Sequence, residues 1–404
     1  MFPPLFEPSG DFTAAALLSG TSQDGLDVAF YRITPSPQEP LRPHMRLLTA
    51  RTHAFPEKLA GMLRHLSFRA DAPVRDLLQF EQHFALFCVN VLQQNAESAG
   101  LNISDLHFIA THGQTLYHEK LSRSAFRALS LQLAGADYLA SKLGCAVVSD
   151  FRTRHIAEGG EGAPLAPILD YLYWQPEAGT RIMLNLGGIA NITVLRAGAS
   201  LAETAYGDTG PANKLMDQLM QRDGGAPWDA GGVIAASGQL QQAVLELLLR
   251  EPYFALPFPK STGPELFNLT ETERRIRTAG LPVPSFPDFM ATLSALTATT
   301  VADAISRLCN SAVTSDAGTE ILVSGGGAKN AHLLRQIELL TELPLRIAGS
   351  EREADGDETA SGSLTADFKE TQLFALLGYL TLYTQGAEIF RPGQPVRLAK
   401  ISLP

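Results

Sequence analysis

Cysteine is scarce in this chain of 404 residues, which contains only Cys88, Cys145 and Cys309. The three are far apart, odd in number and not arranged as C-x-x-C, so neither a disulfide framework nor a zinc site is expected. Free thiols of this kind are typical of proteins that work in a reducing compartment. We therefore expect a cytoplasmic protein.

Excess positive charge and long apolar runs are also missing. The formal net charge is −10, whereas a general nucleic-acid binder normally carries a basic patch. No uninterrupted apolar run approaches the length of a membrane span, and the first residues lack the basic and apolar regions of a signal peptide. Neither a nucleic acid nor a membrane is an expected partner.

Apolar residues, by contrast, are abundant. They make up 45% of the sequence against 18% charged residues, so the chain can bury a large core and disorder is not expected. A length of 404 residues suggests about two domains.

Two stretches open with the same pattern of strand, glycine-containing turn and strand. The first combines an apolar run at 13–18 with an alternating run at 26–33, separated by GTSQDG; the second is IMLNLGGIANITVL at 182–195. Helical and strand patterns follow both of them. This repeated strand–turn–strand pattern, which is not a repeat of the sequence itself, predicts an α/β protein with two duplicated lobes that close on a ligand.

The other elements are predicted from hydrophobic periodicity. Strands are expected at 45–53, 106–111, 145–149 and 320–324, and helices at 56–66, 74–96, 134–143, 213–222, 239–250, 291–309, 330–341 and 369–384. The polar stretch 350–364 is expected to be a mobile loop. We place lobe I at 1–165 with about 386–404 and lobe II at 166–385, with the connection inside 150–180.

The turn GTSQDG at 20–25 is the first candidate for phosphate binding. Its glycines allow positive φ angles, and its hydroxyls and successive N–H groups can form an anion-binding nest. Asp24 and Asp27 provide oxygen ligands of the kind that Mg²⁺ prefers. An ordinary hairpin with Asx chemistry is the alternative interpretation.

Polar residues also follow other strands of the first half. The segment THGQT at 111–115, with Glu119 after it, is expected at the carboxyl end of a strand, where α/β proteins bind ligands. The segment SDFR at 149–152 ends another strand, and GGEGAPLAP at 159–167 leads into a helix whose N-terminus would face the cleft. A hydrogen-bonded turn and a hinge loop are the respective alternatives.

The second half carries comparable segments. NLGGIAN at 185–191 suits a second phosphate-facing hairpin, and SGGGA at 324–328 lets a flat ligand approach the backbone, although it matches neither the P-loop nor the Rossmann pattern. Asp208, in DTGPAN, precedes a tight turn that would present its carboxylate as a base, with an N-cap as the alternative. For KSTG at 260–263 the plainer interpretation is a surface turn. For Glu370 the plainer interpretation is a role in capping a helix.

The order of these segments resembles the anhydro-N-acetylmuramic acid kinase family from about residue 14 to residue 384. The motifs that carry the resemblance are LLSGTSQDGLDVAF, THGQT, VVSDFR with GGEGAP, LNLGGIANIT, DTGPAN, KSTG with E-LFN, and SGGGAKN. The resemblance implies a two-lobed actin/hexokinase-like (ribonuclease H-like) fold with mixed sheets and an interlobe cleft. It also implies a family reaction in which water attacks the anomeric carbon of a 1,6-anhydro sugar while the freed O6 takes the γ-phosphoryl group of ATP.

Site residues are implied by the same resemblance. Asp208 is implied as the base that activates the water, and Asp24 as a ligand of Mg²⁺, directly or through water. His112, Glu119, Arg152 and Glu370 match positions around the sugar pocket. The ATP-binding set comprises Gly20, Thr21, Ser22, Gln23, Asp24, Gly25, Leu26, Asp27, Gly187, Gly188, Asn191, Gly325, Gly326, Gly327, Ala328 and Asn330.

The chain departs from the usual family pattern at several positions, while the phosphate loops stay nearly intact. The departures are Gln23, Lys120, Thr153, His155, Glu161, Ala212 and Pro264. Several of them fall near the expected sugar pocket, so two alternatives to an N-acetylmuramate-forming kinase stay open. One is a kinase of another 1,6-anhydro sugar such as levoglucosan, and the other is a nucleotide-binding sensor without catalysis. The sequence also leaves open whether the chain forms a homodimer.

Overall fold

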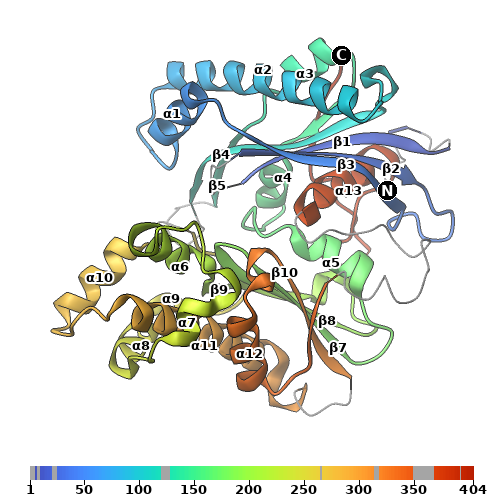
Figure 1. Cartoon of the computed structure of the whole chain (residues 1–404). Helices are drawn as coiled ribbons and strands as arrows, with labels where there is room; N and C mark the ends of the chain where they lie inside the picture. Colours follow the sequence, from blue (N-terminus) through green and yellow to red (C-terminus); the bar gives the residue numbers. More distant parts are fainter. Residues whose placement is uncertain are drawn as a thin grey trace. The chain divides into compact units, whose positions relative to one another are not determined.

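The computed structural model describes residues 5–6, 10–20, 25–119, 128–263, 266–313, 318–348, 368–391 and 393–404, with no side-chain description for 310–313. The predicted mobile loop at 350–364 therefore lies outside the described residues. The chain divides into two compact units (Figure 1). Unit 1 comprises Met1–Tyr173 and Arg352–Pro404, and unit 2 comprises Trp174–Glu351.

Unit 1 is built on a mixed seven-stranded sheet of order β12-β6-β4-β1-β2-β3, with β5 paired to β4. Its strands are β1 (Phe12–Ser19), β2 (Gly25–Thr34), β3 (His44–Ala54), β4 (Phe108–Glu119), β5 (Leu129–Leu133), β6 (Val147–Ser149) and β12 (Lys400–Ser402). β1 pairs antiparallel with β2 and parallel with β4. Nearly every residue of β1 is buried, as expected for a central strand covered on both faces.

Helices cover both faces of this sheet (Figure 1). They are α1 (Glu57–Leu66), α2 (Val74–Ser98), α3 (Ala136–Leu143), α4 (Phe151–Ala157), α5 (Ala166–Trp174) and α13 (Lys369–Tyr383). On one face Phe80, Phe84 and Cys88 of α2, spaced by one helical turn, pack into a cluster with Leu17 and Val28 of the sheet. α13 contacts β1, β2 and β4.

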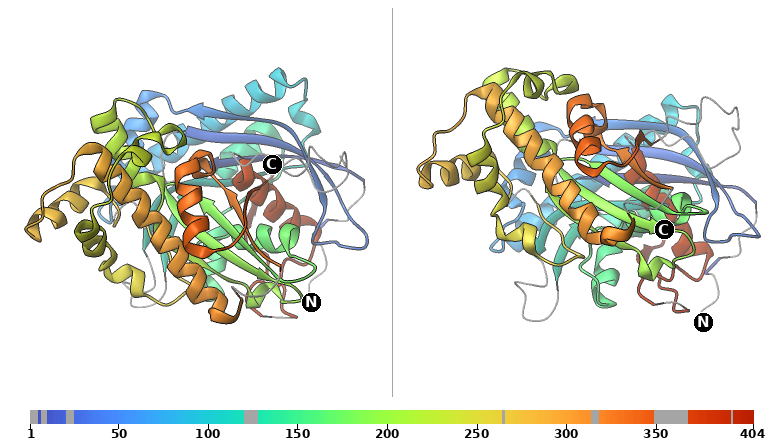
Figure 2. Two further views of the ribbon diagram at one scale, coloured as in Figure 1. Left: turned by 60° about the horizontal axis from the view of Figure 1, so that its bottom comes forward. Right: turned by 90° about the horizontal axis from the view of Figure 1, so that it is seen from below.

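Unit 2 is built on a five-stranded sheet of order β11-β10-β7-β8-β9. Its strands are β7 (Thr180–Leu186), β8 (Ile189–Arg196), β9 (Ala205–Pro211), β10 (Thr319–Ser324) and β11 (Leu345–Ile347). Its helices are α6 (Asn213–Leu219), α7 (Val233–Ser237), α8 (Gln242–Leu249), α9 (Pro252–Ala255), α10 (Leu269–Thr278), α11 (Phe286–Val313) and α12 (Ala331–Thr341). Figure 2 shows α11 running along this sheet, and its residues join the sheet in one apolar cluster.

The apolar character of α11 belongs to this core. The stretch Phe286–Cys309 is long and apolar enough to pass for a membrane span, but 72% of its most apolar window is buried inside the protein. Phe289, Met290 and Leu293 are among its buried residues. A buried core helix accounts for the composition.

The two sheets repeat one topology. In each, the first strand pairs antiparallel with the second and the second with the third, while the first strand also pairs parallel with the fourth long strand, β4 in unit 1 and β10 in unit 2. The predicted repetition of the hairpin pattern at 13–33 and 182–195 is thus confirmed, and it extends to a duplicated ribonuclease H-like sheet.

Three local expectations differ from the structure. THGQT does not follow a short strand, because β4 continues through it to Glu119 by changing partner from β1 to β5. Asp208 lies inside β9 and not before a tight turn. The helix 369–384, expected in lobe II, packs on the sheet of unit 1, because its apolar residues cover β1 and β4.

Candidate active site

The glycine turn of the first hairpin joins β1 to β2, and its middle residues Thr21, Ser22, Gln23 and Asp24 lie outside the described residues. Its two ends are described. The Ser19 hydroxyl hydrogen-bonds to the Gly25 carbonyl oxygen at 3.2 Å and to the Gln114 side chain on β4. A Cβ at residue 25 would lie 2.6 Å from the His53 carbonyl oxygen, so the close approach of β3 requires glycine here.

The residues flanking this turn lie on the central strands of unit 1. Gly20 directly follows β1, and Leu26 is buried in β2. Asp27, also on β2, accepts a hydrogen bond from the Thr52 hydroxyl at 2.5 Å. The hydrogen bond from Thr52, on β3, therefore holds the Asp27 carboxylate in place.

His112 and Arg152 come together in unit 1. His112 lies on β4 and Arg152 in the first turn of α4, and the Arg152 Nε–H group donates to His112 Nε2 at 2.9 Å. Nδ1 of His112 therefore carries the ring hydrogen and donates to the Gly113 carbonyl oxygen at 3.0 Å. Burial, and next the charge of Arg152, lower the pKa of His112 to about 3, so the imidazole is neutral and fixes the guanidinium.

The loop after α4 is fixed in the same way by His155. Its Nδ1 accepts a hydrogen bond from the Gly162 N–H group at 3.0 Å, and burial followed by the charge of Arg152 lowers its pKa to about 4. In the sequence His155 stands out only as a departure from the usual family pattern. Its role in holding the glycine loop becomes visible only in the tertiary structure.

Glu370 lies in the first turn of α13, between two residues whose side chains contact other elements of unit 1. Lys369 Nζ lies 2.5 Å from Oδ1 of the buried Asp170 on α5. The Thr371 hydroxyl lies 2.8 Å from the hydroxyl of Tyr31 on β2. The pKa of Glu370 is raised, first by desolvation within the surrounding protein and then by the charge of Asp27.

The structure gathers three of the four predicted sugar-pocket residues. Phe374, one turn after Glu370, packs against His112 with ring centroids 4.9 Å apart, and the charge of Arg152 acts on Glu370. Glu119 lies apart from them, since it is seven residues beyond His112 on the same strand. At roughly 3.3 Å per residue, seven residues of an extended strand span about 23 Å. Glu119 instead accepts a hydrogen bond from Tyr117 at 2.8 Å.

In unit 2 the glycine segments LNLGG and SGGGA meet. Gly187 and Gly188 form the turn between β7 and β8, where Asn213 donates hydrogen bonds to the carbonyl oxygens of Leu186 and Gly187, both at 2.9 Å. A Cβ on Gly325, whose φ is +82°, would lie 2.5 Å from Asn185 Oδ1. Glycine is needed here because the backbone after β10 touches the end of β7.

The remaining residues of the predicted ATP set occupy the same part of unit 2. Gly326, Gly327 and Ala328 form a short helical turn before α12, and a Cβ on Gly327 would lie 2.6 Å from Leu186 Cβ. Asn330 caps α12 by accepting a hydrogen bond from the Leu333 N–H group at 3.0 Å. Asn191 lies opposite Asp208 in the β8–β9 pairing.

Asp208 is held by hydrogen bonds of both its backbone and its carboxylate. Its backbone N–H group donates to the Lys260 carbonyl oxygen at 2.7 Å, and its own carbonyl oxygen accepts from the Tyr253 hydroxyl at 2.8 Å. Its carboxylate oxygen Oδ2 accepts from the Thr262 N–H group at 2.7 Å. The carboxylate is thereby oriented by the KSTG loop, for which the plainer interpretation of the sequence was a surface turn.

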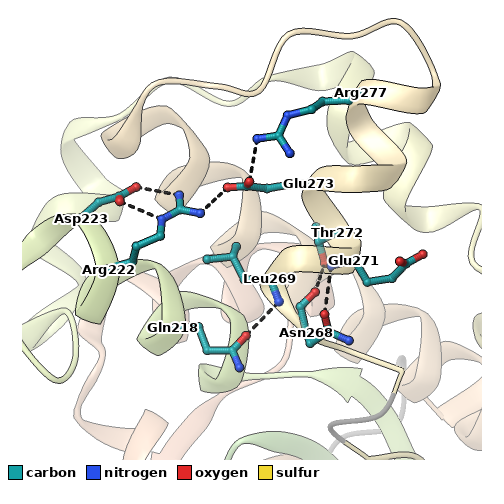
Figure 3. Close-up of polar contacts among 9 residues, drawn as sticks. All are labelled: Gln218, Arg222, Asp223, Asn268, Leu269, Glu271, Thr272, Glu273 and Arg277. Carbon is teal, nitrogen blue, oxygen red and sulfur yellow. Dashed lines mark hydrogen bonds and ion pairs between the residues drawn. The ribbon is translucent and has the colours of Figure 1, made fainter.

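That loop is anchored on both sides. Lys260 is buried, and its ammonium donates to the carbonyl oxygens of Tyr253 and Phe254 at 3.1 and 3.0 Å. Beyond the loop, Asn268 caps α10 and Gln218 of α6 accepts a hydrogen bond from the Leu269 N–H group at 2.8 Å (Figure 3). The helix that follows DTGPAN thus holds the far end of the KSTG-E-LFN motif.

A pair of ribonuclease H-like sheets, each opening with a glycine-turned hairpin, defines an α/β protein of the actin- and hexokinase-like class. The family model for anhydro-N-acetylmuramic acid kinase matches residues 14–390. The anhydro-N-acetylmuramic acid kinase of Gloeobacter violaceus is 37% identical over 372 residues, 91% of each chain. That of Saccharophagus degradans is 37% identical over 325 residues, 80% of this chain and 82% of that one.

The chain belongs to the anhydro-N-acetylmuramic acid kinase family. It is accordingly an enzyme, an ATP-dependent sugar kinase. Among solved structures, the hexokinase from Schistosoma mansoni complexed with glucose aligns with 93% of this chain and 87% of its own, with a TM-score of 0.37 and 12% identity.

Proposed function

We propose that this kinase opens 1,6-anhydro-N-acetylmuramic acid with water and phosphorylates O6 from ATP, giving N-acetylmuramate 6-phosphate in the cytoplasm. Membership of the family supports the substrate class. The observation that carries the chemistry is Asp208, whose carboxylate is oriented by the Thr262 N–H group at 2.7 Å. A fixed carboxylate beside the reacting water is the arrangement that general-base catalysis requires.

In the proposed reaction the bonds change in a coupled sequence. The water oxygen attacks the anomeric carbon while Asp208 accepts a proton from the water. The bond between the anomeric carbon and O6 breaks, and the freed O6 attacks the γ-phosphorus of ATP, from which ADP leaves. The glycine turns at 20–25 and 187–188 would bind the phosphates through backbone N–H groups.

Mg²⁺ would supply charge neutralisation on the phosphates. The described residues contain no group of three or more His, Cys, Asp or Glu side chains arranged to hold a metal ion. Asp27, held by Thr52, fits as an oxygen ligand, because Mg²⁺ usually keeps several waters and takes one or two carboxylates. Asp24, the other proposed ligand, lies outside the described residues.

The sugar would be bound by the cluster of His112, Arg152 and Glu370. The Arg152 guanidinium is a suitable partner for the lactyl carboxylate of a muramic acid, because it forms directional pairs with carboxylates. Levoglucosan has no carboxylate. Arg152 therefore favours the muramic acid derivative over this alternative substrate, and a sensor without catalysis would not need Asp208.

A coupled assay of ADP release tests these alternatives, with anhydro-N-acetylmuramic acid and levoglucosan supplied separately. We expect turnover with the former. Turnover with levoglucosan alone would replace the proposed substrate, and tight ATP binding without ADP release on either sugar would favour a sensor.

The Asp208→Asn variant tests the base. It keeps an acceptor for the Thr262 N–H group but cannot take a proton, so we expect turnover to fall at least 100-fold while ATP binding is retained. The matched control is Asp217→Asn, which changes a carboxylate on the neighbouring helix α6. Turnover by Asp208→Asn at the level of this control would remove Asp208 as the base.

A further inference from the structure

Lys214, the second residue of α6, lies beside the exposed glycine turn of the second hairpin. Its N–H group donates to the Gly188 carbonyl oxygen at 3.1 Å. A Cβ added to Gly188 would lie 3.8 Å from Cβ and 3.9 Å from Cδ of Lys214. The apolar stem of the lysine therefore runs along the side of the turn that lacks a side chain, and two further bonds carry its ammonium beyond Cδ.

The carbonyl groups of the same turn point toward the start of α6. The Gly187 carbonyl oxygen accepts hydrogen bonds from the backbone N–H group of Asn213 at 3.0 Å and from its side chain at 2.9 Å. The Gly188 carbonyl oxygen accepts from the N–H groups of Ala212 and Lys214 at 3.0 and 3.1 Å. Both oxygens are thus occupied, so an anion at the turn is not repelled by an unpaired carbonyl dipole.

The positive charge of Lys214 is available to such an anion. The residue is half-buried, as a lysine is when its stem packs and its head stays in water, and its ammonium forms no ion pair within the described part of the chain. Burial raises the pKa of Asp217, one turn further along α6, to about 6, and the charge of Lys214 opposes this rise. Lys260 is different, because its buried ammonium donates to the carbonyl oxygens of Tyr253 and Phe254.

We propose that Lys214 is a phosphate-binding residue, whose ammonium binds the phosphates of ATP at the turn of Gly187 and Gly188. This inference rests on the proposed function, which puts the phosphates at this turn, and adds a residue to the nucleotide site. A lysine ammonium is a compact point charge with three donors, which suits phosphate oxygens. Backbone N–H groups of the turn give the phosphates their position, and Lys214 supplies the positive charge that the turn itself lacks.

The Lys214→Met variant removes the ammonium, keeps an unbranched apolar stem beside Gly188 and changes helix propensity little. Binding of a non-hydrolysable ATP analogue with Mg²⁺, measured by calorimetry without sugar, should weaken about tenfold, because a hydrogen bond to a charged group is lost. Lys214→Arg keeps the charge and should bind the analogue within about threefold of wild type. Lys142→Met is the matched control, since Lys142 is exposed in the last turn of α3 in unit 1, and it should bind like wild type.

Ionic strength separates a charge contact from a packing role. Salt screens the ammonium, so the affinity of wild type for the analogue should fall more steeply with added salt than that of Lys214→Met. Equal salt dependence in the two proteins, or binding by Lys214→Met at the level of the Lys142→Met control, overturns the inference. A lower urea midpoint with equally weakened binding in both Lys214 variants would also overturn it, in favour of packing. A wild-type chain that binds the analogue but turns over neither anhydro sugar would instead overturn the proposed function, so the two failures are distinguishable.

Discussion

Acidification should destabilise this protein through two buried neutral histidines. His155 has its pKa lowered from 6.5 to about 4, first by burial and then by the charge of Arg152. The pKa of His112 is lowered to about 3 by the same two causes. Both pKa values are lower in the folded chain than in the unfolded chain, so the stability linked to these histidines is fully present above pH 6.5. It is lost as the pH falls from 6.5 toward the folded values, where the unfolded chain binds the additional protons.

The magnitude follows from the width of that window. Each pH unit in which one site is protonated only in the unfolded chain lowers the free energy of unfolding by about 1.4 kcal/mol. Moving from pH 7 to pH 5 covers about 1.5 such units below the ordinary histidine value. The expected loss is therefore about 2 kcal/mol for each of the two histidines.

The His155→Asn variant isolates one contribution. Asparagine does not titrate, and its Oδ1 atom can take the place of Nδ1 as the acceptor for the Gly162 N–H group. Urea unfolding of the full chain, followed by circular dichroism at pH 7 and pH 5, gives the pH-dependent loss for each protein. The variant should lose about 2 kcal/mol less than wild type between the two values.

His65→Asn is the control, since His65 is exposed at the end of α1. It should show the same pH-dependent loss as wild type. An equal loss in wild type and His155→Asn would refute the argument, because it would mean that His155 binds its proton equally well in the folded and unfolded chains.

The remaining predictions concern stability and turnover. Asp170→Asn removes the charge that pairs with the largely buried Lys369 ammonium, so it should lower the free energy of unfolding by about 3–5 kcal/mol in urea titrations. The Asp170→Leu/Lys369→Met pair should recover much of this loss, and a loss below about 1 kcal/mol in Asp170→Asn would contradict the argument. Asn268→Ala removes the N-cap of α10 and should cost about 1 kcal/mol, and an unchanged urea midpoint would exclude the capping role. Gly207→Ala places a methyl group 2.6 Å from the Phe258 ring, so the loop beside Asp208 should shift. Steady-state assays should then show a lower kcat, and a wild-type kcat would show that the loop tolerates the change.

Much of the fold was predictable because it is encoded locally. The two hairpins at 12–34 and 180–196 have apolar strands on either side of glycine turns, and both lie where the periodicity predicted them. Gly325 and Gly327 are required by close approach to the end of β7, and the ordered motifs were enough to indicate the family that the comparisons establish.

Other features were decided by contacts between distant parts of the chain. Periodicity predicted helix 369–384, but its assignment to unit 1 depends on which sheet its apolar residues cover. The pairing of Lys369 with Asp170 joins residues about 200 positions apart, and no local pattern specifies it.

The sequence by itself determined the strands, the glycine turns and the family, because propensity, periodicity and motif order act over short stretches of chain. Only the tertiary structure decided that Thr262 holds Asp208, that Arg152 is paired with a neutral His112, and that Glu119 lies away from them. These outcomes depend on strand length, register and loop anchoring, which are set by packing across the whole unit.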